Sequence, residues 1–186
     1  YKRQVEYLQL PSPHKSRKRR LMPSEKEYLL TASSSQRNIY IAPIIEFAIE
    51  TGMRRSEILN LRWVDVDLDS GFAFLFDTKN SEDRRVPMTK TARDVLSRLP
   101  KQHERVFPIS ANCVRLAWER CRNKAGISDL RFHDLRHEAV SRFFEMKSNP
   151  STSANGHWFV SFRMAVLSKV DASIAVGGNR LSLIHI

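Results

Sequence analysis

The chain has 186 residues, which is enough for one domain with a substantial core but not for two. Its 31 lysines and arginines exceed its 20 aspartates and glutamates, so the formal net charge of +11 favours a polyanionic partner, nucleic acid before an anionic membrane. No apolar run approaches the roughly 20 residues needed to span a bilayer, and the N-terminus lacks the apolar core of a signal peptide. We therefore expect a cytoplasmic protein.

The first 20 residues predict a linker or basic arm that follows an upstream domain. They contain Pro11 and Pro13 and no pattern able to form a core. A solvated charge run is the alternative, but the density of cations favours contact with a phosphate backbone. The predicted DNA contacts of this segment are Lys15, Arg17, Lys18, Arg19 and Arg20.

The elements that follow predict a mainly α fold with a small antiparallel β-sheet (α+β). Ser24 and Glu27 form a capping box that predicts a helix start, and apolar residues at helical spacing predict a helix over 41–51 that ends at Gly52. A short helix over 55–62 and a β-like stretch over 63–68 come next. A hairpin is predicted from strands 72–77 and 84–88, joined by a polar turn. Further helices are predicted at residues 91–99, 110–125 and 133–145.

The cysteines predict neither a disulfide nor a metal site. Cys113 and Cys121 lie in one helical pattern, where their spacing puts them about 12 Å apart along the axis, too far for a disulfide. Two thiols without a nearby histidine also make a poor metal site. Both are expected to be reduced core residues.

Four polar residues are candidates for binding a phosphate group. Arg54 stands at a corner between two predicted helices, where a guanidinium can fork onto two phosphate oxygens. His133 and Arg136 are predicted on one helical face above a buried stripe. Lys79 lies in the hairpin turn, where neighbouring cations can lower its pKa and let it donate a proton. Each of the four could instead be an ordinary structural residue or a solvated surface residue, so the prediction depends on the four occurring together.

Three motifs in this order resemble the tyrosine recombinase, or phage integrase, family. They are Thr51-Gly52-Met53-Arg54-Arg55-Ser56-Glu57 with its continuation to Trp63, then Thr78-Lys79-Asn80 with Arg84-Arg85-Val86-Pro87-Met88, then Phe132-His133-Asp134-Leu135-Arg136-His137-Glu138-Ala139. The resemblance implies the catalytic-domain fold over residues 21–145, with residues 1–20 as the preceding linker. It also implies duplex DNA as the partner, self-association on DNA, and no metal or cofactor.

The resemblance also implies a role for each candidate residue. Arg54 and Arg136 would neutralise the non-bridging oxygens of the scissile phosphate, and His133 would assist proton transfer. Lys79 would protonate the 5′-oxygen that leaves, and Arg84 would contact the DNA. A tyrosine near the C-terminus attacks in this family and forms a 3′-phosphotyrosine.

The C-terminal part departs from the family pattern. Gly156-His157 lies near the place of the family's Gly-His pair, in a Pro/Ser/Asn-rich context, so His157 is a candidate for the fifth site residue and a chance match is the alternative. Position 166, where the nucleophile is expected, is valine, and the tyrosines are Tyr1, Tyr7, Tyr28 and Tyr40. We interpret residues 146–186 as an aberrant or unstructured tail that follows a change of reading frame. A Gly-His followed by Tyr in another frame of the gene would support this interpretation.

Three functional hypotheses follow from the sequence. The first is an integrase catalytic domain that lacks its nucleophile and does not cleave DNA. The second is a DNA-binding module that occupies recombination sites without cutting. The third is a basic helical protein in which the His133 and Arg136 motif is structural.

Overall fold

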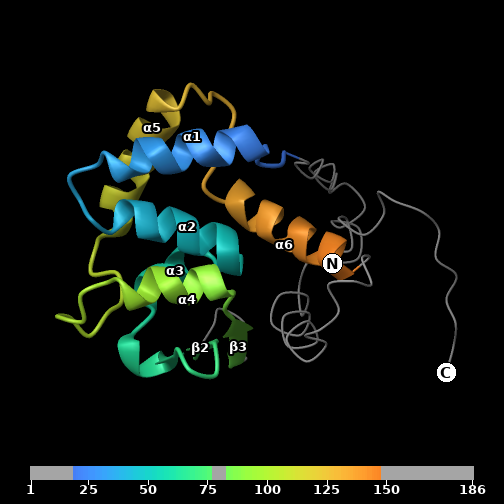
Figure 1. The fold of residues 1–186 in the computed structure, drawn as a ribbon. Coiled ribbons are helices and arrows are strands. Elements are labelled where there is room, and N and C mark those ends of the chain that lie inside the picture. Colours follow the sequence, from blue (N-terminus) through green and yellow to red (C-terminus); the bar gives the residue numbers. More distant parts are fainter. Residues whose placement is uncertain (1–18, 77–82, 148–186) are drawn as a thin grey trace, which may run out of the picture. The chain divides into compact units, whose positions relative to one another are not determined.

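A computed structural model describes residues 19–76 and 83–147, without the side chains of the last two (Figure 1). The predictions for Lys15, Arg17, Lys18, Lys79 and His157 fall outside the described residues. Six α-helices are described: α1 (Pro23–Ser34), α2 (Ile41–Thr51), α3 (Arg55–Asn60), α4 (Lys90–Ser97), α5 (Ala111–Lys124) and α6 (Asp134–Lys147). The short 3-10 helix η2 (Trp63–Asp65) follows α3, and the strands are β1 (Val66–Asp67), β2 (Phe72–Leu75) and β3 (Arg84–Pro87). The predicted fold class is confirmed. Within these ranges no helix combines the length and the apolar composition needed to cross a lipid bilayer.

Helix α2 is the centre of the hydrophobic core. Eight of its residues are buried, and it packs against α1, α4 and α6 (Figure 1). Ile44, Ile45 and Ile49 are fully buried, as their helical spacing predicts. Gly52 ends the helix with a φ of 63° and donates its N–H to the carbonyl of Ala48 at 3.0 Å. Both predicted ends of this helix are confirmed, because a left-handed residue after the last turn is the usual place for glycine.

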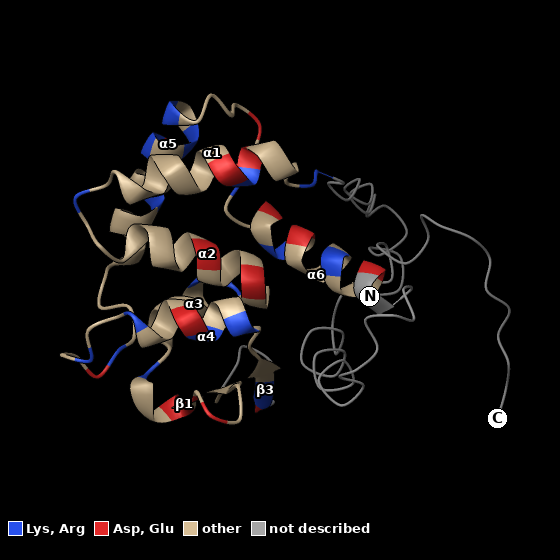
Figure 2. Cartoon of the chain, in the orientation of Figure 1, with Lys and Arg blue, Asp and Glu red and all other residues tan. Residues whose placement is uncertain are grey.

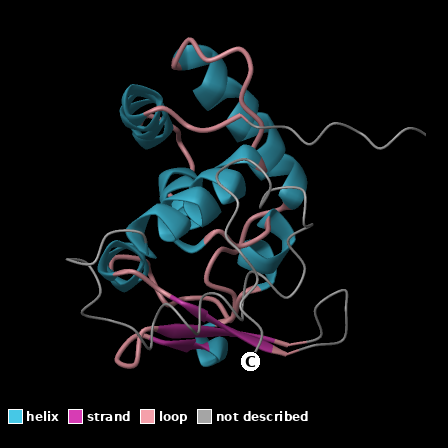
Figure 3. Cartoon of the chain, turned by 90° about the vertical axis from the view of Figure 1, so that its right-hand side faces the viewer, coloured by secondary structure: helices cyan, strands magenta, loops and turns pink. Residues whose placement is uncertain are grey.

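A three-stranded antiparallel sheet in the order β1-β2-β3 lies along one edge of the helical part (Figure 3). Ala73 pairs with Val86, and Leu75 pairs with Arg84. Ala73, Val86 and Leu75 are buried, so this register turns Arg84 toward the inner face. Arg85 pairs with Phe74 on the opposite face, and its guanidinium carbon lies 6.0 Å from the ring centroid of Phe72.

A buried carboxylate ties α2 to three other elements. Glu50, which is 5% exposed, accepts hydrogen bonds from Lys26 of α1 at 3.2 Å and from Thr89, the N-cap of α4, at 3.0 Å. Arg142 of α6 approaches the same carboxylate at 3.4 Å. Figure 2 shows that acidic and basic positions are interleaved along α6. Charged pairs therefore help to fix α6 against the core.

Several predicted element boundaries differ from those in the structure. Helix α1 begins at Pro23 instead of Ser24, because proline fits the first turn and the carboxylate of Glu25 accepts the N–H of Met22 at 2.9 Å. Helix α3 ends at Asn60, before the predicted residue 62, because Leu61 accepts a hydrogen bond from the N–H of Val106 at 2.9 Å.

Two other predictions needed correction. The β-like stretch 63–68 forms η2 and then β1, so the sheet has a third strand besides the predicted hairpin. Helix α6 begins at Asp134 instead of His133, and the Asp134 carboxylate accepts the N–H of Arg131 at 2.8 Å. Of the two free thiols, Cys121 is buried as predicted, whereas Cys113 is partly exposed.

Candidate phosphate-binding site

Arg54 presents its guanidinium from the corner between α2 and α3. The residue is extended and precedes the first residue of α3, and its backbone N–H donates to Oε2 of Glu57 at 2.7 Å. Its Nη1 donates to Oε1 of the same carboxylate at 2.8 Å. The Nε and Nη2 groups have no hydrogen-bond partner among the described residues, and the side chain is 41% exposed. Two donors of a charged group are thus available to an anion.

Arg136 lies beside this corner, although it comes from α6. The residue is only 8% exposed, and its Nη1 donates to the carbonyl oxygen of Gly52. The approach is close, because a Cβ on Gly52 would lie 3.2 Å from the Cβ of Ala139 in α6. Burial, followed by the positive charge of Arg54, lowers the pKa of Arg136 to about 10. The group is therefore still charged at neutral pH, and among the described residues no carboxylate forms an ion pair with it.

Arg84 and Glu57 complete the charged cluster. Nη2 of Arg84 lies 2.6 Å from Oε2 of Glu57, and the two side chains are 12% and 10% exposed. Burial lowers the pKa of Arg84, and the nearby charge of Arg54 lowers it as well, whereas Glu57 raises it. Glu57 is a site residue that the sequence analysis missed. Its spacing from Arg54 is that of a capping box, which was the available signal.

His133 stands next to Arg136, immediately before α6. Its carbonyl accepts the N–H of Arg136 at 3.0 Å, and its ring meets that of His137 edge to face, with centroids 5.1 Å apart. Partial burial lowers the pKa of His133, and His137 and Arg136 lower it further. The imidazole is therefore neutral at pH 7 and has one nitrogen able to accept a proton.

Arg19 and Arg20, which we predicted as DNA contacts, are engaged by acidic groups of the chain itself. Arg19 donates to the carbonyl of Asp129 and to Glu25, each at 2.9 Å. Arg20 donates to the two oxygens of Glu138 at 3.1 and 3.2 Å and also pairs with the carboxylate of Glu145. The C-terminal end of the basic segment is thus fixed to the start of α1 and to α6.

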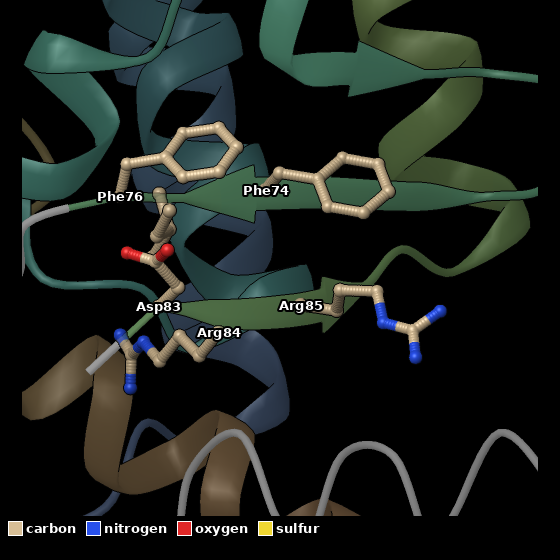
Figure 4. Close-up of a pocket in the computed structure, with 6 residues that line it drawn as sticks. Phe74, Phe76, Asp83, Arg84 and Arg85 are labelled. Carbon is tan, nitrogen blue, oxygen red and sulfur yellow. The ribbon is translucent and has the colours of Figure 1, made fainter.

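A small cavity lies beside the cluster, at the end of the β2–β3 pair where Phe76 and Asp83 lie (Figure 4). Its volume is about 220 Å³, and its lining consists of Phe74, Leu75, Phe76, Asp83, Arg84 and Arg85. Figure 4 shows the side chains of Arg84 and Arg85 extending in different directions. Neither Arg54 nor Arg136 lines the cavity, so it is separate from these two guanidinium groups.

The comparison with known proteins decides the family of this chain. Residues 19–155 match the Phage integrase family. The chain belongs to this family. A shufflon-specific DNA recombinase of Escherichia coli is 43% identical over 145 residues, which cover 77% of this chain and 38% of that protein. The integrase of Salmonella phage P22 is 29% identical over 154 residues, covering 72% of this chain and 39% of the integrase.

Solved integrase structures share the fold. The catalytic core of lambda integrase has a TM-score of 0.59 at 20% identity, covering 75% of this chain and 90% of that one. This likeness confirms the expected tyrosine recombinase catalytic-domain fold. The chain spans less than half the length of the two curated relatives described above. The activity of a whole integrase is therefore a proposal for this chain.

Proposed function

We propose that residues 21–145 are the catalytic domain of a tyrosine site-specific recombinase, a phage or mobile-element integrase that acts on duplex DNA in the cytoplasm. One observation carries the proposal. Arg54 and Arg136 come from separate elements at the Gly52 corner, near enough for the charge of Arg54 to lower the pKa of Arg136, which is still charged and has no carboxylate partner among the described residues. A phosphodiester is an anion with two non-bridging oxygens, and two guanidinium groups match it.

The proposed chemistry is electrostatic. Arg54 and Arg136 neutralise the non-bridging oxygens as charge develops on the phosphate, and they are held in place before the reaction by Glu57 and by the Gly52 carbonyl. Neutral His133 accepts or returns a proton next to Arg136. We assign the protonation of the 5′-oxygen to Lys79 and keep His157 as a candidate fifth site residue. The chemistry requires no metal or cofactor.

The proposed domain holds DNA but does not cleave it. Strand cleavage in tyrosine recombinases needs a tyrosine nucleophile, and the matching position is Val166. Of the tyrosines in this sequence, Tyr28 lies in α1 and Tyr40 immediately precedes α2, both upstream of the site. The alternative function is a DNA-binding module that occupies recombination sites without cutting. A suicide DNA substrate tests the absence of cleavage, because only a cleaving enzyme gives a covalent adduct that resists SDS. Such an adduct would contradict both the non-cleaving catalytic domain and the alternative module.

The binding of phosphate can be tested by the salt dependence of DNA binding. We expect Arg54→Ala with Arg136→Ala to make the slope of log affinity against log salt shallower by about 0.9 for each phosphate that the protein no longer neutralises. Arg98→Ala with Arg115→Ala removes the same charge from exposed positions at the C-terminus of α4 and on α5 and serves as the control. Equal slopes in the two double variants, on a duplex of random sequence, would contradict the proposal.

A further inference from the structure

We propose that Arg84 is a positioning residue of the phosphate site, which acts through Glu57 to fix the direction in which Arg54 presents its guanidinium. The inference rests on the proposed function and adds to it a third arginine that does not itself have to touch the DNA. It also replaces the expectation that Arg84 is a simple DNA contact.

The two oxygens of Glu57 are shared between the two arginines. Oε2 accepts the backbone N–H of Arg54 at 2.7 Å and Nη2 of Arg84 at 2.6 Å. Oε1 accepts Nη1 of Arg54 at 2.8 Å. Because Arg84 holds the carboxylate from strand β3, the carboxylate cannot turn freely, and its second oxygen fixes one edge of the Arg54 guanidinium. The other donors of Arg54 then point away from Glu57.

Burial distinguishes the roles of the two arginines. The Arg84 side chain is 12% exposed and that of Glu57 is 10% exposed, whereas the Arg54 side chain is 41% exposed. Charged hydrogen bonds are stronger where water is excluded. The buried Arg84–Glu57 ion pair is therefore a fixed support, and of the two arginines that contact Glu57, Arg54 is the one that an anion can reach. Arg136 is as buried as Arg84, but it has no carboxylate partner among the described residues, so its charge stays available to the anion.

The charge of Arg84 also prevents Glu57 from cancelling the charge of Arg54. A carboxylate with Arg54 as its sole partner would compete with a phosphate for the same guanidinium. Arg84 supplies a second cation to that carboxylate, so the cluster of three guanidinium groups and one carboxylate stays positive. Its influence extends to α6, since the positive charge of Arg84 is among the causes that lower the pKa of Arg136.

Arg85 provides a matched control for Arg84. The two are adjacent in β3, but Arg84 pairs with buried Leu75 on the inner face, whereas Arg85 is exposed and pairs with Phe74 on the outer face. Replacing either by glutamine removes one positive charge from the same strand. A general electrostatic effect on an anion would appear in both variants, but an effect through Glu57 would appear only in Arg84→Gln.

The test is a titration of the whole chain with inorganic phosphate, followed by NMR of the arginine Nε–Hε groups. In the wild type we expect the signals of Arg54 and Arg136 to shift together with one dissociation constant. Arg84→Gln should bind phosphate roughly tenfold more weakly, the effect of losing one charged hydrogen bond. The Arg54 signal of that variant should already differ from the wild type before phosphate is added. Arg85→Gln should match the wild type in both respects.

Arg84→Lys keeps the charge, and we expect it to restore most of the phosphate affinity but not the wild-type Arg54 signal, because an ammonium lacks the planar fork. This variant also supplies the answer if Arg84→Gln does not fold: a wild-type Arg54 signal in Arg84→Lys would overturn the proposal. Equal phosphate affinity and equal Arg54 signals in wild type and Arg84→Gln would overturn it as well. If phosphate shifts neither Arg54 nor Arg136 in the wild type, the proposed function itself fails.

Discussion

Replacing Gly52 by alanine tests the close approach of the α2–α3 corner to α6. The residue has a φ of 63°, and a Cβ there would lie 3.2 Å from the Cβ of Ala139. Holding an L-residue in the left-handed region costs about 1–2 kcal/mol. Crowding a packed contact adds about 1–3 kcal/mol. We therefore expect Gly52→Ala to lower the free energy of unfolding by about 2–5 kcal/mol.

Gly126 separates the backbone effect from the packing effect. Its φ of 70° is close to that of Gly52, but a Cβ there would meet nothing within 4 Å. Gly126→Ala should therefore show only the backbone cost of about 1–2 kcal/mol. The gain from a stiffer unfolded chain is similar for both substitutions and cancels in their difference.

Urea denaturation measures both variants, and Ala139→Gly completes a double-mutant cycle. Removing the Cβ of Ala139 should relieve the contact, so we expect Gly52→Ala and Ala139→Gly to be coupled by about 1 kcal/mol. If Gly52→Ala and Gly126→Ala lose the same free energy, and the cycle shows additivity within about 0.3 kcal/mol, the packing argument is wrong.

Three further predictions concern charged groups. Glu50→Ala leaves Arg142 and Lys26 without their buried carboxylate, so urea denaturation should show that the free energy of unfolding falls by about 3 kcal/mol. A fall below about 1 kcal/mol would mean that these ion pairs contribute no more than exposed surface pairs do. Arg20 lowers the pKa of Glu145 below its ordinary 4.5, so this pair stabilises the fold above that pH and the stabilisation is lost as pH falls through the lower folded-state value. The unfolding free energies of Arg20→Gln and wild type should therefore converge in acid, and a constant difference from neutral pH into acid would contradict this. NMR titration of His133 should give a pKa below 6.5. This pKa should rise when phosphate binds, because the anion offsets the nearby arginine charges. An unchanged pKa would show that phosphate binds elsewhere.

Patterns among residues close together in the sequence predicted helices α2 and α5. The apolar spacing of α2 and the glycine after it fixed both helix ends, and Ser110 caps α5 through a hydrogen bond from the N–H of Cys113 at 3.2 Å. The buried residues of α5 lie at helical spacing on one face and are Val114, Ala117, Trp118 and Cys121. In these cases the nearest neighbours in the chain decide the structure.

Long-range pairing decided what the sequence analysis missed. Whether Arg84 faces inward depends on its register with Leu75, and a shift by one residue would have placed Arg85 there instead. The partners of Arg20 lie 118 and 125 residues away, so no local pattern indicates that this arginine is engaged within the chain. The same reason explains why Glu57 was not among the predicted site residues.

The hydrogen bond from Arg136 to the Gly52 carbonyl has a consequence for the order of folding. The two residues are 84 positions apart in the chain, so the anion site does not exist until α6 has docked on α2. During synthesis from the N-terminus, helices α1 to α5 leave the ribosome before the helix that completes the site. A nascent chain that stops before α6 would present Arg54 without Arg136 and could not bind a phosphodiester with two guanidinium groups.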